Sequence, residues 1–102
     1  PATASGAIIG NQAINTMVAG LARELAPKKI RVNAVSPTWT PTGLWRDLSP
    51  RDRTVAEGQM ASQIPLGRVG TVDEVAQGFA FVITNGFING QVVKIDGGID
   101  LA

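Results

Sequence analysis

Residues 30–37 read Ile-Arg-Val-Asn-Ala-Val-Ser-Pro, and apolar side chains alternate with other residues along them. This period is typical of a β-strand, so we expect a strand over 30–35 that Pro37 ends. A helical pattern stopped by Pro27 precedes the stretch, and a loop rich in Thr, Pro and Trp follows it over 36–48. A helix, a strand and a loop in this order form the α/β arrangement in which ligands bind beyond the carboxyl ends of strands.

The sequence before this strand predicts a long helix. It begins near Gly6, with Ser5 or Thr3 as its cap, and runs to residue 25. Its apolar face has helical spacing and consists of Ile14, Met17, Val18, Leu21 and Leu25. Small residues such as Ala13 and Gly20 lie beside that face. They fit either close packing on a sheet or a tight helix contact between subunits.

The sequence after the loop predicts two more helices and a second strand. Ser49-Pro50 begins a short, mobile helix that runs to about Gln63. The capping box Thr71-Val72-Asp73-Glu74 begins another helix, which Asn85-Gly86 ends. Residues 91–95 form the second strand, before a turn at 96–98. The order helix, strand, helix, helix, strand predicts an α/β fold with parallel strands and a right-handed crossover.

Composition excludes several classes of function. The 102 residues fit one small domain, and nine basic against eight acidic residues leave a net charge of +1, which is no nucleic-acid signature. There is no His, Cys or Tyr, so His catalysis, thiolate chemistry and the usual metal sites are excluded. No apolar run reaches the roughly 18 residues of a membrane span, and residues 1–5 do not resemble a signal peptide. We expect a cytoplasmic protein with no metal.

Four blocks of the chain resemble the C-terminal half of short-chain dehydrogenases/reductases. They are Leu-Ala-Arg-Glu-Leu-Ala-Pro at 21–27, the strand at 30–37, the segment 64–76 that begins Ile-Pro-Leu-Gly-Arg, and Asn-Gly-Gln-Val-Val-Lys-Ile-Asp-Gly-Gly at 89–98. The resemblance covers essentially the whole chain. It implies a single partial Rossmann-like domain over 1–102, containing the last two strands of a sheet that binds NAD or NADP.

The resemblance also implies that this chain lacks the catalytic residues of the family. The family's Tyr and Lys, four residues apart on the first helix, fall on Ala7 and Asn11. Ala7 has no titratable group and Asn11 has no charge, so neither can act as the acid–base group or support one. The glycine-rich phosphate turn and the catalytic Ser and Asn of the family belong to a part with no counterpart here. We therefore expect no catalytic residue in this chain, as in divergent members that lack the Tyr.

The loop after the first strand carries the implied binding residues. Pro37, Thr40 and Thr42 match family positions that lie against the nicotinamide, although Thr38 replaces a family Gly. A loop that merely ends a strand is the alternative. Trp39, Leu44 and Trp45 fall in the segment that covers substrate in the family, and they could equally be core residues of a shortened domain.

Two hypotheses for function follow. In the first, the chain is a relative of NAD(P)-dependent oxidoreductases that cannot catalyse hydride transfer alone. In the second, it is a standalone oligomeric binding module with a small apolar ligand near the Trp residues. A different enzyme class would need paired carboxylates, and Asp47, Asp52 and Glu57 show no such spacing. Because two parallel strands are too few for a stable sheet, we also expect a homo-oligomer with helix 6–25 in its interface.

Overall fold

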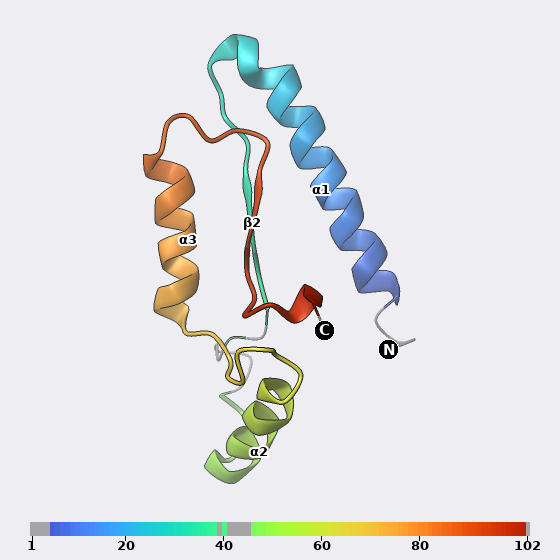
Figure 1. Cartoon of the computed structure of the whole chain (residues 1–102), viewed down its shortest axis with the longest axis vertical. Coiled ribbons are helices and arrows are strands. Elements are labelled where there is room, and N and C mark those ends of the chain that lie inside the picture. The colour runs from blue at the N-terminus through green and yellow to red at the C-terminus, as the bar shows by residue number, and fades with distance from the viewer. Residues whose placement is uncertain (1–4, 39, 41–45, 102) are drawn as a thin grey trace. The chain divides into compact units, whose positions relative to one another are not determined.

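The computed structural model describes residues 5–38, 40 and 46–101 (Figure 1). It is an α/β structure with the predicted order of helices and strands. The elements are α1 (Ser5–Leu25), η2 (Ala26–Lys28), β1 (Ala34–Pro37), α2 (Pro50–Ala61), α3 (Val72–Thr84), β2 (Val92–Ile95) and η4 (Ile99–Leu101). α1 begins at Ser5, one residue before the predicted start near Gly6, and its capping by Ser5 or Thr3 stays a prediction.

β1 and β2 form a two-stranded sheet. The Ala34 amide donates to the Gln91 carbonyl at 2.9 Å, and the Thr38 amide donates to the Ile95 carbonyl at 3.4 Å. Both partners advance by four residues, so the strands are parallel, as predicted. In Figure 1 the two strands run side by side.

The predicted start of the first strand at residue 30 is wrong, because β1 begins at Ala34. The Val32 amide donates to the side-chain oxygen of Asn89 at 3.0 Å. The Gly90 amide in turn donates to the Val32 carbonyl at 2.9 Å. A side chain therefore takes the place of a backbone partner for the Val32 amide, although the alternating pattern continues through this residue.

The chain divides into two compact units, which we describe separately. The first contains Pro1–Ala34 and Val82–Val93, and the second contains Val35–Phe81 and Lys94–Ala102. The single domain over 1–102 stays a prediction.

Polar side chains hold the first unit together. Asn33 donates to the Ile88 carbonyl at 3.0 Å and accepts from the Gln91 amide at 3.0 Å. Arg31 donates to the carbonyls of Val82, Ile83 and Ile88 at 2.7, 2.9 and 3.1 Å. Two of these carbonyls belong to the last turn of α3, where helix carbonyls lack partners within the helix. The Arg31 side chain therefore caps the C-terminal end of α3.

Among the residues whose burial the structure describes, few apolar side chains are buried. They are Val18, Ala22 and Val82 in the first unit and Ile64 in the second. On the predicted apolar face of α1, Leu25 is half-buried, whereas Ile14, Met17 and Leu21 are all exposed. This leaves α1 with a strip of apolar surface of the kind that oligomers bury.

In the second unit, α2 is a surface helix with no buried residue. Its predicted cap is confirmed, because Ser49 accepts from the Asp52 amide at 3.1 Å and Pro50 is the first helical residue. The helix ends at Ala61, two residues before the predicted Gln63. The segment that follows is anchored by Ile64, which is 3% exposed and packs against Gly97. Among residues 5–38, 40 and 46–101, no helix is both long and apolar enough to cross a bilayer.

Candidate functional site

In the second unit, the carboxyl ends of β1 and β2 border a cavity of about 510 Å³. Thr38 lines it from the segment that follows β1. The turn after β2, 96–98, contributes Asp96, Gly97 and Gly98. Because both strands are parallel, the segments that leave them emerge at one edge of the sheet, where α/β folds bind ligands.

The predicted cofactor residues are only partly within the described chain. Pro37 is the last residue of β1 and is exposed. Thr40 is half-buried, donates from its hydroxyl to the Thr38 carbonyl at 3.1 Å, and lies beside Gly70. Thr42 lies outside the described residues. The structure thus brings Pro37 and Thr40 to one strand end, and their contact with a nicotinamide stays a prediction.

The predicted substrate residues, Trp39, Leu44 and Trp45, also lie outside the described residues. Their role in covering substrate and the alternative of a core role both stay predictions. The described wall of the cavity is nevertheless partly apolar, with Ile64, Leu66 and Ile95 among its residues.

An ion pair that the sequence analysis did not predict lies on the same cavity. Arg68 donates to both carboxylate oxygens of Glu74, at 2.8 and 2.7 Å. The amide of Thr71 also donates to this carboxylate at 3.0 Å, and the Glu74 amide donates to the Thr71 hydroxyl at 3.1 Å. The predicted capping box is therefore confirmed, and Arg68 extends it. The sequence contains one signal for this ion pair, because Arg68 lies six residues before Glu74. Gly67, next to Arg68, turns the chain with a φ of 78°.

These hydrogen bonds favour the charged forms of Glu74 and Arg68. The hydrogen bonds from the Arg68 guanidinium, followed by those from Thr71, lower the pKa of the Glu74 carboxyl to about 2. The hydrogen bond to Glu74 likewise raises the pKa of Arg68 above its usual value. Lys94, which lines the same cavity, forms an ion pair with Asp100, and that hydrogen bond raises its pKa. Both cations of the cavity wall are therefore already paired.

The start of α3 does not fit a pyrophosphate. A dinucleotide phosphate normally lies on free amides at a helix N-terminus after a glycine-rich turn. Here Gly67-Arg68-Val69-Gly70 precedes the helix, but its cation pairs with Glu74 and the carboxylate of Glu74 occupies the first turn. A second negative charge there would be repelled, so this turn is a helix cap and not a phosphate loop.

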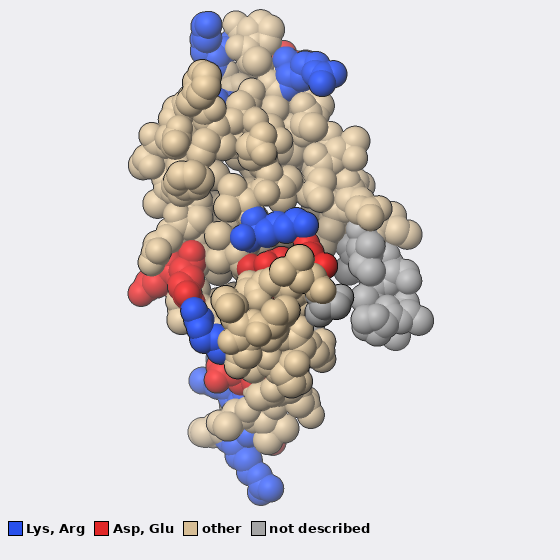
Figure 2. Space-filling model, in the orientation of Figure 1, with Lys and Arg blue, Asp and Glu red and all other residues tan. Residues whose placement is uncertain are grey.

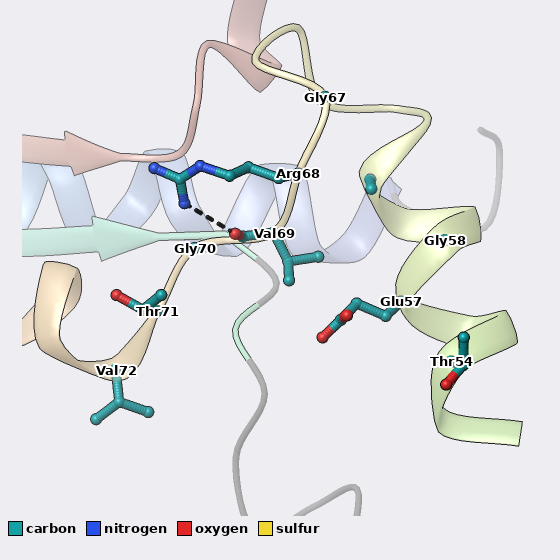
Figure 3. Close-up of a pocket in the computed structure, with 10 residues that line it drawn as sticks. Thr54, Glu57, Gly58, Gly67, Arg68, Val69, Gly70, Thr71 and Val72 are labelled. Atoms are coloured by element: carbon teal, nitrogen blue, oxygen red, sulfur yellow. Dashed lines mark hydrogen bonds between the residues drawn. The ribbon is translucent and has the colours of Figure 1, made fainter. Parts of the chain in front are cut away.

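A second cavity of about 680 Å³ lies between α2 and the connector that precedes α3. Figure 3 shows Thr54 and Glu57 projecting from α2, with Thr71 and Val72 across from them at the start of α3. Arg68 again contributes and donates to the Val69 carbonyl at 3.1 Å. Glu57 is the one carboxylate residue that lines this cavity, and within the described part of the chain no three carboxylates gather to hold a metal ion.

The two positions that match the family's Tyr and Lys lie in α1, in the first unit. Asn11 is exposed, and it precedes the buried Val18 by seven residues, or about two helical turns. It therefore lies on the same side of α1 as Val18. That Ala7 and Asn11 correspond to the family's Tyr and Lys stays a prediction.

Comparison with known proteins places these features in a family. Residues 10–100 match the family model described as enoyl-(acyl carrier protein) reductase. Human 3-oxoacyl-[acyl-carrier-protein] reductase is 41% identical over 81 residues, which are 79% of this chain and 31% of that protein. An uncharacterized oxidoreductase of Bacillus subtilis is 36% identical over 86 residues, which are 82% of this chain and 34% of that protein.

Solved structures also match this chain over most of its length. A small-chain dehydrogenase in complex with NADPH matches with a TM-score of 0.77 and 38% identity, over 90% of this chain and 41% of that one. A C-terminal deletion mutant of Thermoplasma acidophilum aldohexose dehydrogenase matches with a TM-score of 0.81 and 26% identity, over 97% of this chain and 46% of that one. The chain thus spans about a third of the two curated relatives and less than half of these two structures.

Proposed function

The chain belongs to the short-chain dehydrogenase/reductase family, and on that premise we propose that it is the C-terminal part of an NAD(P)-dependent oxidoreductase that cannot catalyse hydride transfer by itself. The observation that supports the proposal is the match over residues 10–100. The resemblance puts the family's acid–base positions at Asn11 and, outside that match, at Ala7. Neither side chain exchanges a proton near neutral pH. A complete enzyme would need an acid–base group from outside this chain.

The proposed role in cofactor binding is confined to the nicotinamide end. Pro37, Thr40 and Thr42 would hold the carboxamide beyond the end of β1, where the backbone amide and carbonyl of Thr40 would meet it. The pyrophosphate has no fitting site at the start of α3, because Glu74 occupies it. We expect binding of NAD or NADP by the isolated chain to be weak or absent.

The proposed substrate contacts are Trp39, Leu44 and Trp45, beside the cavity at the strand ends. The apolar wall formed by Ile64 and Leu66 favours a substrate with an apolar part. Proteins of this kind need no membrane span or metal, and we propose a cytoplasmic location.

A second candidate function is a homo-oligomeric binding module with a small apolar ligand near the Trp residues. The exposed strip of Ile14, Met17 and Leu21 on α1 favours it, because a second copy of the chain would bury that strip. Oligomer formation is compatible with both candidates, so cofactor binding decides between them.

The test is a titration of the purified chain with NADH and with NADPH, followed by nucleotide fluorescence, with a full-length family member as the positive control. We expect no turnover and a dissociation constant weaker than about 10 μM, which corresponds to about −7 kcal/mol. Thr40→Pro, which removes the backbone N–H, should remove the residual binding if the strand-end loop holds the nicotinamide. Turnover that persists on repurification, and is lost in a variant of this chain, would contradict the proposal.

A further inference from the structure

The dipeptide Asn-Gly occurs twice in the first unit, at 85–86 and again at 89–90. In this dipeptide the backbone nitrogen of the glycine can attack the side-chain amide of the asparagine, because glycine has no Cβ to hinder the approach. The attack closes a succinimide ring and expels ammonia. The fold surrounds the two copies differently, and it therefore decides which of them can react.

The second copy is held at each group that the reaction needs. The side-chain oxygen of Asn89 accepts from the Val32 amide at 3.0 Å, and its side-chain nitrogen donates to the Ala22 carbonyl at 3.4 Å. The Gly90 nitrogen, which would be the nucleophile, donates to the Val32 carbonyl at 2.9 Å. Asn89 and Gly90 are also half-buried. Ring closure at Asn89 therefore requires these hydrogen bonds to open first.

The first copy is open to solvent. Asn85 and Gly86 are exposed, and the Phe87 side chain that follows them is 99% exposed. A Cβ built on Gly86 would meet no atom within 4 Å. Among residues 5–38, 40 and 46–101 no acceptor is found for the Gly86 amide, so its nitrogen lacks the restraint that Gly90 has.

One contact at the first copy favours the attack. The Phe87 amide donates to the side-chain oxygen of Asn85 at 3.1 Å. This hydrogen bond folds the Asn85 side chain toward the residues that follow it, the direction in which the Gly86 nitrogen lies. It also stabilises the negative charge that develops on the side-chain oxygen when that nitrogen attacks. The turn therefore orients and activates Asn85, whereas the contacts of Asn89 protect it.

We infer that Asn85 is a site of spontaneous deamidation at the end of α3. The Gly86 nitrogen forms a bond to Cγ of Asn85, the Cγ–Nδ2 bond breaks, and the side-chain nitrogen leaves as ammonia with the proton that Gly86 loses. Water then hydrolyses either carbonyl of the ring. One product has aspartate at position 85, and the other has isoaspartate, in which the main chain passes through the former side chain. In total the reaction consumes water and releases ammonia, with no oxidant or reductant.

The isoaspartate product disturbs a shared anchor of the first unit. The Ile88 carbonyl accepts from Arg31 at 3.1 Å and from Asn33 at 3.0 Å. The Ile88 amide donates to the Asn85 carbonyl at 3.4 Å. In isoaspartate that carbonyl belongs to a free carboxylate and the main chain gains a methylene, so Ile88 shifts relative to its partners. The aspartate product keeps the original main chain.

Both products add a negative charge to a unit that has little of it. Glu24 is the one acidic residue in the sequence of the first unit. Figure 2 shows uncharged tan surface where α3 ends. The carbonyls of a last helical turn disfavour a carboxylate, and here two of them, those of Val82 and Ile83, accept from Arg31. The added charge makes the modified chain separable from the parent by ion exchange.

The test is a timed incubation of the full chain in mildly alkaline buffer, followed by digestion with chymotrypsin. This protease cleaves after Phe81 and Phe87, so Asn85 and Asn89 fall in separate peptides. Each deamidation raises the peptide mass by about 1 Da. We expect the Asn85 peptide to gain this mass at least about tenfold faster, because Asn89 must wait for local opening. Equal rates in the folded chain would overturn the inference.

Two controls separate the fold from the local sequence. In guanidinium chloride the two rates should converge, and an undiminished preference for Asn85 there would show that flanking residues cause it and that the inference is wrong. Gly86→Ala should slow the reaction at Asn85 severalfold, because its Cβ hinders the nucleophile. Gly58→Ala on α2, where a Cβ also meets open space, should leave the rate unchanged. An unchanged rate in Gly86→Ala would exclude the Gly86 nitrogen as the nucleophile.

The effect on the fold is measured on the separated products. Ion exchange isolates them, and labelling by an isoaspartyl methyltransferase identifies the isoaspartate form. We expect that form to melt below both the parent and Asn85→Asp, which supplies the same charge on the original main chain. A melting temperature equal to that of Asn85→Asp would show that the anchor at Ile88 tolerates the added methylene, and the inferred damage to the first unit would be wrong.

Discussion

The carboxylate of Glu74 accepts two hydrogen bonds from the guanidinium of Arg68, at 2.8 and 2.7 Å, across the start of α3. The same carboxylate accepts from the Thr71 amide. One side chain thus fixes both the connector at 67–70 and the first turn of the helix. It also neutralises the cation that a phosphate would otherwise use.

The first prediction concerns the dependence of stability on pH. The folded state holds the pKa of Glu74 at about 2, below its ordinary value of 4.5. A carboxyl whose pKa is lowered by folding stabilises the protein above its unfolded pKa, and this contribution is lost as pH falls toward its folded pKa. Urea unfolding should therefore show Glu74→Gln to be less stable than the parent at neutral pH, with the difference shrinking between about pH 4.5 and pH 2.

The matched control for this prediction is Asp47→Asn, which removes an exposed carboxylate outside α3. Its stability relative to the parent should change much less over the same pH range. A difference between Glu74→Gln and the parent that stays constant down to pH 2 would show that the Arg68 pair does not form in solution.

The second prediction tests the cap. Thr71→Ala removes the hydroxyl that accepts from the Glu74 amide, and the loss of an N-cap costs about 1 kcal/mol. Thr71→Ser keeps the hydroxyl and should lie close to the parent. The denaturant midpoint measures both variants, and an unchanged midpoint for Thr71→Ala would mean that the cap contributes nothing.

Local patterns predicted these caps well, for a physical reason. The partners Ser49 and Asp52, and likewise Thr71 and Glu74, are three residues apart, so one turn of chain brings them together. The start of β1 could not be predicted in this way. There the Asn89 side chain, 57 residues farther along the chain, accepts from the Val32 amide in place of a backbone carbonyl.

Only part of the candidate site could be predicted from the sequence. The strand period put the end of the first strand at residue 35, two residues before the end of β1 at Pro37. Pro37 and Thr40 as binding residues rest on the family resemblance and stay predictions. The pairing of Arg68 with Glu74 depends on the turn at Gly67, which a capping pattern does not describe. The exposure of Phe87 depends on which segments pack against residues 85–90, and periodicity carries no information about that.

The third prediction concerns Asn89. Its side chain accepts from the Val32 amide at 3.0 Å and donates to the Ala22 carbonyl at 3.4 Å. Asn89→Ala leaves the Val32 amide and the Ala22 carbonyl without that partner, which should cost about 1–3 kcal/mol in urea unfolding. Gln91→Ala removes a more exposed amide from the same segment and should cost much less. Equal losses for the two variants would contradict a specific role for Asn89.

The fourth prediction compares the loss of stability caused by substituting Ala for each of three glycines. A Cβ on Gly97 would lie 2.5 Å from the Ile64 side chain, and the residue also has a φ of 63°. Gly67 has a φ of 78° with open space around it, and Gly86 has open space without a positive φ. Substitution by Ala should therefore destabilise most at Gly97, by about 1–3 kcal/mol, less at Gly67 and least at Gly86. Thermal unfolding gives the order, and equal losses at Gly97 and Gly67 would rule out the contact with Ile64.

The last prediction concerns assembly. Met17 is 55% exposed in the chain and lies between Ile14 and Leu21 on the uncovered strip of α1. A two-stranded sheet with so little buried core is marginal by itself, so we expect copies of the chain to associate through this strip. Light scattering should give at least twice the chain mass of 10.6 kDa. Met17→Asp should dissociate or unfold the assembly, because it would place a charge in a buried contact.

Gln12→Asp is the control for assembly. Gln12 is five residues before Met17 and so points away from the strip, and the same charge there should leave the mass unchanged. Dissociation by Met17→Asp alone would place the strip in the interface. Dissociation by both variants would indicate a general effect of charge on α1. A folded monomer of the parent chain at micromolar concentration would show that α1 meets no second copy and that its apolar strip is covered in some other way.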